Sequence, residues 1–432
     1  MTRKNVQRAI GAGVTVAGAL AVLIAPALGE ERAGRAVEFT TVNGVESTRN
    51  ATLTPGGEIT RTQVFSDLGA AISSRTATQH LVLSFGARAR MISDDTPGAD
   101  EGADLGNPRF GLNYDAHTSG ARLRIKVNYD QQDIGFLNLS DLVTVDDTGI
   151  IVADDVTDVS GLGTRDSLTF RATAQFGLDR PFGWGVTVTG ADLSYSDMPV
   201  QTLQDNTALT AAVFARADLS PALRLDARLG LAHYETDGGV GRDTTTFNTT
   251  LTAIQSDRFR LRGTLGVSDP DTAAMRSSLT AGFVYEPNRK NRFSLDIGAA
   301  VSDDFENQFI GRLNYAARPS SALTLRAALD SQVTDTTERA SVLNSAAVIG
   351  ATYVLSPLSS VSFDAIYVQE EPFDGAADSS AATAAIQFNR QIGRDWMVAI
   401  GAKATRRKET GLADADSESL FFNIGRSWNS RF

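Results

Sequence analysis

The chain has 432 residues, 42% of them hydrophobic, with no cysteine and a formal net charge of −11. The absence of cysteine excludes a disulfide framework, thiolate metal sites and cysteine nucleophiles. The acidic balance argues against nucleic acid as a general partner, because attraction to phosphates needs a basic surface. Beyond the N-terminal segment, no apolar stretch is long enough to cross a bilayer as a helix.

The N-terminal segment has the pattern of an export signal. It opens with a basic group consisting of Arg3, Lys4 and Arg8. An uncharged, mostly apolar run from Ala9 to Ile24 follows, and Ala27-Leu28-Gly29 then places small residues at the two positions that a signal peptidase reads. We predict a cleaved signal peptide over residues 1–29 and a mature chain over 30–432. The short apolar run disfavours the alternative, a retained membrane anchor.

The mature chain reads as a series of strand-like segments, the first near 36–47. In each segment, apolar residues alternate with polar or small ones, as in the Leu-Arg-Leu-Asp-Ala-Arg-Leu run over 223–229. Alternation at period two places one set of side chains on each face of a strand. Counting these segments predicts about twenty antiparallel strands, with eighteen as the alternative. An even number is favoured because both chain ends then lie at the same end of a barrel.

Short and long connectors alternate along the chain. The short ones contain proline or glycine, as at 179–181, 220–221 and 356–358. The longer, acidic ones are 93–107, 131–164, 197–206, 235–243, 334–342, 371–380 and 407–416. Short turns at one end and long loops at the other are typical of outer-membrane barrels, so the predicted fold is an all-β, transmembrane, antiparallel up-and-down β-barrel. The longest connector, 131–164, is expected either outside the cell or folded toward the lumen.

The alternation also predicts what lines the lumen. A sheet in a membrane must close, because unpaired backbone groups are costly in hydrocarbon, so one face of each strand meets lipid and the other faces inward. With the leucines outward, the predicted lumen cations and selectivity candidates are Arg88, Arg90, Arg122, Arg124, Lys126, Arg224, Arg228, Arg258, Arg260, Arg262, Arg312 and Arg326. Lumen acids are expected to be fewer, the clearest being Asp226, Asp296, Asp330 and Asp364. Such a lumen would attract anions, or its arginines would brace the wall by pairing with acids and carbonyls.

Metal binding and catalysis have weak support. Two long connectors are rich in carboxylates, Asp94, Asp95, Asp100, Glu101 and Asp104 in one and Asp146, Asp147, Asp154, Asp155 and Asp158 in the other. Oxygen-rich groups suit calcium, but neither connector has the spacing of a dedicated calcium loop, so we predict solvated acids, no metal site and no cofactor.

The three histidines are His80, His117 and His233. Of these, only His233, beside Tyr234 and Glu235, is placed for an acid–base pair. No nucleophile elbow, zinc-binding histidine pair or phosphate loop is present, so we predict that the chain is not an enzyme.

The C-terminal strand carries a recognisable pattern. The stretch Phe422-Asn423-Ile424-Gly425-Arg426-Ser427-Trp428, followed by Phe432, resembles the β-signal of outer-membrane proteins. The resemblance implies that the barrel assembly machinery recognises this strand, through Phe422, Ile424, Gly425, Trp428 and Phe432. The four residues after Trp428 depart from the pattern and leave open which aromatic residue is read.

More broadly, residues 36–432 resemble the porin-like outer-membrane barrels of proteobacteria, exopolysaccharide-associated barrels among them. The resemblance lies in Gly and Ser-Pro turns, leucines two apart, and Asn107-Pro108 entering a strand. It implies the outer membrane of a Gram-negative bacterium, a periplasmic C-terminus, and lipid and lipopolysaccharide as surroundings. The predicted function is a passive channel for small or extended anionic solutes, saccharides among them. The alternatives are a closed structural or surface-interaction barrel without conductance, and an outer-membrane hydrolase or acyltransferase.

Overall fold

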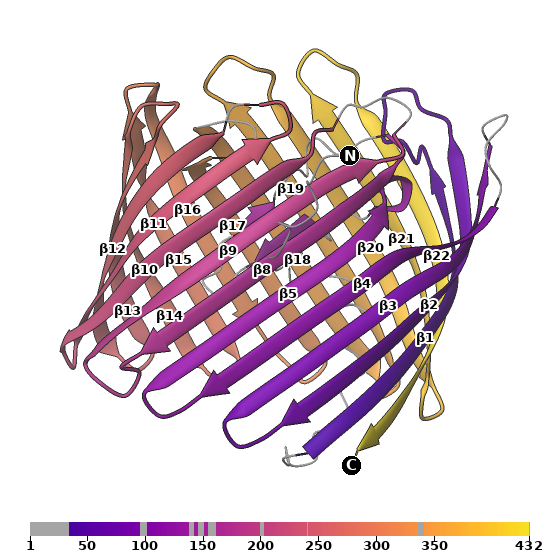
Figure 1. Cartoon of the computed structure of the whole chain (residues 1–432), viewed down its shortest axis with the longest axis horizontal. Helices are drawn as coiled ribbons and strands as arrows, with labels where there is room; N and C mark the ends of the chain where they lie inside the picture. Colours follow the sequence, from indigo (N-terminus) through magenta and orange to yellow (C-terminus); the bar gives the residue numbers. More distant parts are fainter. Residues whose placement is uncertain are drawn as a thin grey trace, which may run out of the picture.

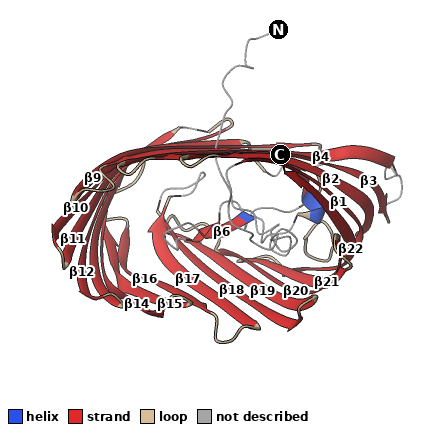
Figure 2. Cartoon of the chain, turned by 90° about the horizontal axis from the view of Figure 1, so that it is seen from below, coloured by secondary structure: helices blue, strands red, loops and turns tan. Residues whose placement is uncertain are grey.

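The chain folds into a closed antiparallel barrel with a small hairpin inside it (Figures 1 and 2). The computed structural model describes residues 34–95, 102–137, 142–145, 151–153, 161–198, 203–239, 241–335 and 341–431. The first barrel strands are β1 (Gly34–Arg49), β2 (Thr60–Arg75), β3 (Gln79–Asp94), β4 (Gly102–His117), β5 (Ala121–Asp133), β8 (Thr164–Phe176), β9 (Phe182–Ser196), β10 (Asn206–Ser220), β11 (Leu223–Thr236) and β12 (Arg242–Ser256). The remaining ones are β13 (Phe259–Pro270), β14 (Arg276–Asn288), β15 (Asn291–Ser302), β16 (Phe305–Ala317), β17 (Leu323–Thr334), β18 (Val342–Ser356), β19 (Ser359–Pro372), β20 (Ser379–Ile392), β21 (Trp396–Glu409) and β22 (Ala415–Arg431). Between β5 and β8 lie the short 3-10 helix η1 (Ile134–Phe136) and the hairpin strands β6 (Val143–Val145) and β7 (Ile151–Ala153).

The barrel strands follow one another around the ring in chain order. Each pairs with its chain neighbours, and β1 pairs with β22 to close a sheet of 20 strands. The predicted fold class and the preferred strand number are therefore confirmed. The first strand, Gly34–Arg49, extends beyond the predicted 36–47 at both ends. The predicted signal peptide lies outside the described residues, and no helix within them is long and apolar enough to cross a membrane.

Large apolar side chains cover the outside of the barrel. Leu68, Leu209, Phe309 and Leu420, on four different strands, are between 50% and 69% exposed. A continuous apolar surface of this kind is unfavourable in water and fits the hydrocarbon of a bilayer. All three tryptophans, Trp184, Trp396 and Trp428, also face outward, close to the short-turn end, where aromatic residues form the girdle of a transmembrane barrel.

The two ends of the barrel differ in their connectors. The connectors predicted to be short lie at the end that also holds the last residues of β22, and those predicted to be long lie at the opposite end (Figure 1). Three connectors at the long-loop end were not anticipated from the sequence: the ordered segment 50–59, the segment 271–275 and the two-residue turn 303–304. Asn107-Pro108 does not enter a strand but lies inside β4, where the pairing with β3 shifts register. Asn107 takes a positive φ of 50° there, so the pair forms a bulge.

The hairpin of β6 and β7 lies within the ring of strands (Figure 2). Its Val143 is 2% exposed and packs in an apolar cluster with Val348 on β18 and Ile366 and Val368 on β19. An inward apolar patch is unusual for a water-filled barrel, where inward positions are normally polar. The described hairpin of the β5–β8 connector therefore occupies part of the lumen.

Candidate functional site: the barrel lumen

The pairing registers place the predicted lumen cations on the inward face, with one exception. Residues opposite each other in an antiparallel pair share a face, and Leu68, next to Asp67, is 52% exposed on the outside. Asp67 and its partner Arg88 therefore point inward. The same reasoning around the ring gives inward positions to Arg88, Arg90, Arg122, Arg124, Lys126, Arg224, Arg228, Arg260, Arg262, Arg312 and Arg326.

The exception is Arg258, for which the predicted lumen position is wrong. It lies in the exposed two-residue turn between β12 and β13, outside both strands. The Ser256 Oγ accepts hydrogen bonds from the backbone N–H groups of Arg258 and Phe259. This turn interrupts the alternation that had grouped Arg258 with Arg260 and Arg262.

The lumen holds more acids than the sequence reasoning foresaw, and they pair with the arginines. Arg88 contacts Asp67 at 2.7 Å, and Arg224 contacts Asp218 at 2.7 Å. Further lumen acids that pair with cations are Glu46, Asp104, Asp115, Asp133 and Glu286. Asp67 and Asp218 each precede a leucine that faces outward, so the same period-two argument, applied to acids as carefully as to arginines, would have found them.

On one wall, opposite charges alternate along a single rung of the sheet. Arg262 on β13, Asp296 on β15, Arg312 on β16 and Asp330 on β17 are connected by successive register pairs. Arg262 donates through two nitrogens to the Asp296 carboxylate, and Arg312 donates to Asp330 at 3.3 and 3.4 Å. Two cations and two anions on one rung leave it with no net charge.

Where an arginine and an aspartate pair across an intervening strand, a glycine on that strand leaves space for their side chains. Gly282 on β14 lies in register between Arg262 and Asp296, and a Cβ built on it would stand 2.2 Å from the Asp296 Oδ1. The same arrangement recurs where Gly350 on β18 lies in register between Arg326 on β17 and Asp364 on β19. Arg326 donates to Asp364 at 2.5 Å across that glycine. These ion pairs tie together strands that share no backbone hydrogen bond.

A cavity of about 680 Å³ opens above this rung, on the wall formed by β10 to β17. Its lining includes the four charged residues of the rung and a second rung of Thr250, Thr264 and Thr280. Asn248 and Ser278 lie one rung further toward the long connectors. We call the lumen surface formed by Arg262, Asp296, Arg312, Asp330, Thr250, Thr264, Thr280, Asn248, Ser278 and Phe214 the balanced groove. The same cavity is also lined by Asp226, Arg228 and Arg276, and Arg276 is paired with Asp335, so four cations face four acids.

On β5 and β8, by contrast, the cations outnumber the acids. Arg122, Arg124 and Lys126 follow each other on the inward face of β5, and Arg171 on β8 stands in register with Lys126. Asp115 contacts Arg122 at 2.6 Å and Arg124 at 3.4 Å. Within the described part of the chain, neither Lys126 nor Arg171 has a carboxylate partner. We call these four cations the basic strip, and it carries a clear excess of positive charge.

Asp133 fixes the root of the connector that enters the lumen. Its side chain is 8% exposed and contacts Arg61 at 2.9 Å and Arg90 at 3.2 Å. It also accepts the backbone N–H of Gly135 at 2.9 Å, which caps η1. Asp133 thus joins the connector to the walls of β2 and β3.

Asp335 holds a second connector, between β17 and β18. The carboxylate accepts from Arg276 at 2.6 and 3.0 Å, from the Ser341 N–H at 3.1 Å and from the Thr244 hydroxyl at 3.1 Å. Burial raises the pKa of Asp335, but the hydrogen bonds from Arg276 and Ser341, together with the charges of Arg276 and Arg242, lower it by more. The pKa of Asp335 therefore lies below its usual value, and the carboxylate is ionised at neutral pH.

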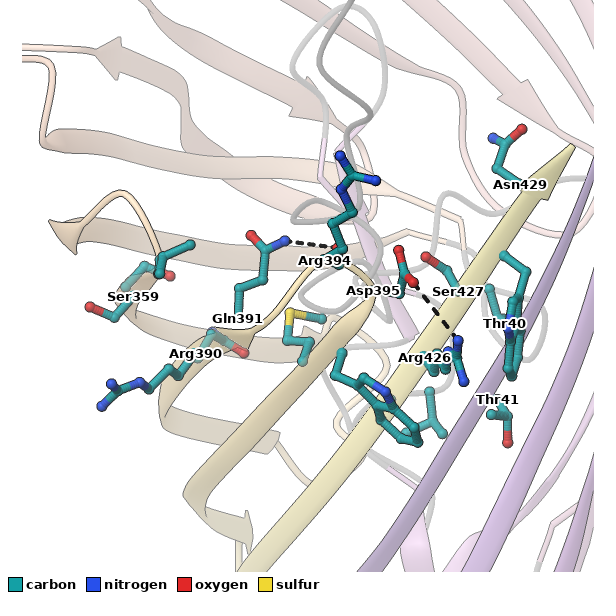
Figure 3. A pocket seen from close by; sticks show the side chains of 18 of the residues that line it. Thr40, Thr41, Ser359, Arg390, Gln391, Arg394, Asp395, Arg426, Ser427 and Asn429 are labelled. Carbon is teal, nitrogen blue, oxygen red and sulfur yellow. Dashed lines mark hydrogen bonds and ion pairs between the residues drawn. The ribbon is translucent and has the colours of Figure 1, made fainter. Parts of the chain in front are cut away.

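At the short-turn end, the residues of the assembly-signal prediction fall on both faces of β22. Phe422, Ile424 and Trp428 face outward and Gly425 faces inward, while Phe432 lies outside the described residues. A cavity of about 650 Å³ lies at this end, and Figure 3 shows side chains that line it. The Arg426 guanidinium there lies 3.8 Å from Asp395, and its Cζ is 5.3 and 4.8 Å from the ring centroids of Trp396 and Trp428.

The histidines and acidic connectors add no chemical site in the described part of the chain. His80 and His117 lie beside short turns, and His233 faces outward with its Nδ1 2.8 Å from the Asp243 carboxylate. No group of three or more His, Asp or Glu side chains in the described ranges could hold a metal ion. Asp146, Asp147, Asp154, Asp155 and Asp158 of the second acidic connector lie outside those ranges, as do Asp100 and Glu101 of the first.

A closed sheet with an apolar exterior and a charged interior defines a transmembrane β-barrel. No protein family matches the chain by sequence, and no curated protein does. Among solved structures, the copper transporter OprC is 11% identical over 93% of this chain and 82% of that chain, with a TM-score of 0.47. A ferric enterobactin receptor, PfeA of Pseudomonas aeruginosa, is 10% identical over 93% and 82%, with a TM-score of 0.45. The outer membrane protein opdK of the same species is 11% identical over 91% and 99%, with a TM-score of 0.39.

Proposed function

We propose that the protein is an outer-membrane channel that passes small or extended anionic solutes, saccharides bearing acidic groups among them. The apolar exterior and the aromatic girdle support a place among outer-membrane lipid and lipopolysaccharide. The acidic long connectors then face outward, the C-terminus faces the periplasm, and β22 is the strand read by the assembly machinery.

The observation that carries the proposal is the basic strip. Lumen arginines such as Arg88, Arg262 and Arg312 contact carboxylates, so their field is largely cancelled at the distance of a passing solute. Lys126 and Arg171 stand side by side without such partners in the described residues. Cations that line a pore without matching acids raise the local concentration of anions and lower that of cations.

Reversal potentials across a planar bilayer under a salt gradient test the proposal. Wild-type protein should show anion preference, and the double variant Lys126→Gln/Arg171→Gln should reduce the anion-to-cation permeability ratio by about tenfold, from roughly threefold per charge removed. Arg390→Gln is the matched control, because Arg390 is an exposed cation on the outward face of β20. Cation preference in the wild type, or an equal change in the control, would contradict the proposal.

A closed barrel without conductance is the second candidate, and the lumen hairpin favours it. Val143 packs against Val348, Ile366 and Val368 in the lumen. Asp133, at the start of the same connector, is held by ion pairs with the barrel wall. Val143→Asp would place a carboxylate on this apolar patch and expel the hairpin. If the wild type is silent and Val143→Asp conducts, the hairpin is a plug. If both conduct, it only narrows the channel.

A further inference from the structure

The balanced groove differs from the basic strip in charge and in hydrogen-bonding groups. Its three threonines lie on one rung across β12, β13 and β14, and Thr250 and Thr264 are hydrogen-bonded at 2.9 Å. A threonine hydroxyl can both donate and accept a hydrogen bond, so a row of threonines can donate to or accept from the hydroxyl groups of a solute. The row carries no charge, so it does not itself favour an anion over a neutral solute.

The charged rung beneath the threonines alternates donors with acceptors. Arg262 and Arg312 supply guanidinium N–H groups, and Asp296 and Asp330 supply carboxylate oxygens, with no net charge between them. An anion gains little here, because each cation is already neutralised by its neighbour. A neutral solute with adjacent hydroxyls can donate to a carboxylate and accept from the guanidinium beside it, and both bonds are charge-assisted.

Phe214 gives the groove an apolar surface at one side. The residue lines the cavity and stands in register with Gly185 on β9. A Cβ built on Gly185 would lie 2.4 Å from the Phe214 Cζ, so the ring lies across the space that this glycine leaves free. Solute sites combine an apolar face with a few placed polar groups, and an aromatic ring suits the C–H face of a sugar.

From these three features we propose that the balanced groove binds neutral, polyhydroxylated solutes of the chemical class of a disaccharide. The proposal rests on the proposed channel function for the route by which a solute reaches the groove. Its chemistry is independent of that function, since the groove is charge-balanced whereas the basic strip is not. The lumen thus holds two sites that sort solutes by charge.

Equilibrium dialysis of labelled sucrose against the full-length barrel in detergent tests this directly. Sucrose should bind the wild type, and Thr264→Val/Thr280→Val should weaken binding by about tenfold, because two hydrogen-bonding groups are lost at nearly constant volume. Thr173→Val/Thr187→Val is the matched control. It removes another inward pair of hydroxyls, 3.0 Å apart, from β8 and β9. Phe214→Leu supplies a second test, with weaker sucrose binding expected, should the threonine variant fail to fold.

The outcomes separate this inference from the proposed function. Sucrose that fails to bind the wild type, or that binds the groove variant as well as the wild type, overturns the inference even if the channel prefers anions. Equal loss in the groove variant and the control overturns it too. Sucrose binding that survives in Lys126→Gln/Arg171→Gln supports it, and binding in a barrel that does not conduct would contradict only the channel function.

Discussion

Two walls of the lumen use the same basic side chains with opposite results. On β5 and β8, Arg122 and Arg124 contact the carboxylate of Asp115, whereas Lys126 and Arg171 have no carboxylate partner within the described residues. On β13 to β17, two arginines alternate with two aspartates along one rung. Both walls have arginine at alternate positions of a strand, so the chain itself does not distinguish them. The residue across the neighbouring strand decides whether a cation is available to a solute or serves to hold the wall together.

The largest effect should come from breaking the balanced wall at its glycine. In Gly282→Ala, the new Cβ would stand 2.1 Å from the Leu295 backbone oxygen and 2.2 Å from the Asp296 Oδ1, so both backbone and ion pair must move. We expect a loss of about 3 kcal/mol in the free energy of unfolding, measured by urea titration in detergent. Gly263→Ala on β13 is the control, because its nearest atom would be the Thr280 oxygen at 3.9 Å. Equal stability of the two variants would show that the bridge over Gly282 contributes nothing.

A somewhat smaller loss is expected at the rim above the balanced wall. Asp335→Asn leaves Arg276, whose side chain is 10% exposed, without its carboxylate and should cost about 2 kcal/mol. Because the pKa of Asp335 is lowered, its contribution is complete above the unfolded value of about 3.9 and disappears as the pH falls through the lower folded value. Unfolding measured from about pH 7 to about pH 3 should therefore show an acid-dependent loss in the wild type that is smaller in the variant. Identical pH profiles would contradict this role.

One substitution should bring the net charge of the balanced wall closer to that of the basic strip. Asp296→Asn keeps the shape of the rung but removes one of its two acids, which gives the balanced wall a net positive charge like that of the basic strip. We expect the anion-to-cation permeability ratio to rise by about threefold. The reversal potential measures it, and Asn314→Asp, which adds an acid to the inward face of β16, should move the potential in the opposite direction.

The smallest expected effect is that of salt concentration, which requires no mutation and should act differently on the two walls. Raising the salt from about 0.1 M to 1 M shortens the Debye length from about 10 Å to about 3 Å. The anion preference set by the basic strip should then fall by about twofold, while sucrose binding in the balanced groove changes little. Parallel loss of both properties would mean that the two walls do not differ in the way proposed.

The sequence was sufficient to predict the fold because the alternation of apolar and polar residues identifies the two faces of each barrel strand. It predicted the up-and-down barrel, the preferred strand number and the sorting of short and long connectors. It could not predict which charges meet, since register between strands is not written in the alternation, and a shift of one residue reverses the face. The shift between Gly86 and Arg88, where β4 bulges at Asn107, is one such event. The contact of Val143 with the barrel wall could not be predicted either, because the connector that carries Val143 has no regular alternation of apolar and polar residues.

The seam between β1 and β22 gives the molecule a particular order of formation. All other pairings in the ring join strands close in the chain, whereas the seam joins Ala36 to Arg431 and Arg49 to Glu418. Bringing such distant segments together carries the greatest loop-closure entropy, so the seam is expected to form last. Until it does, the sheet has two open edges that can pair with other chains. Substitutions along β1 and β22 that weaken their pairing should therefore prolong the period in which these edges are open.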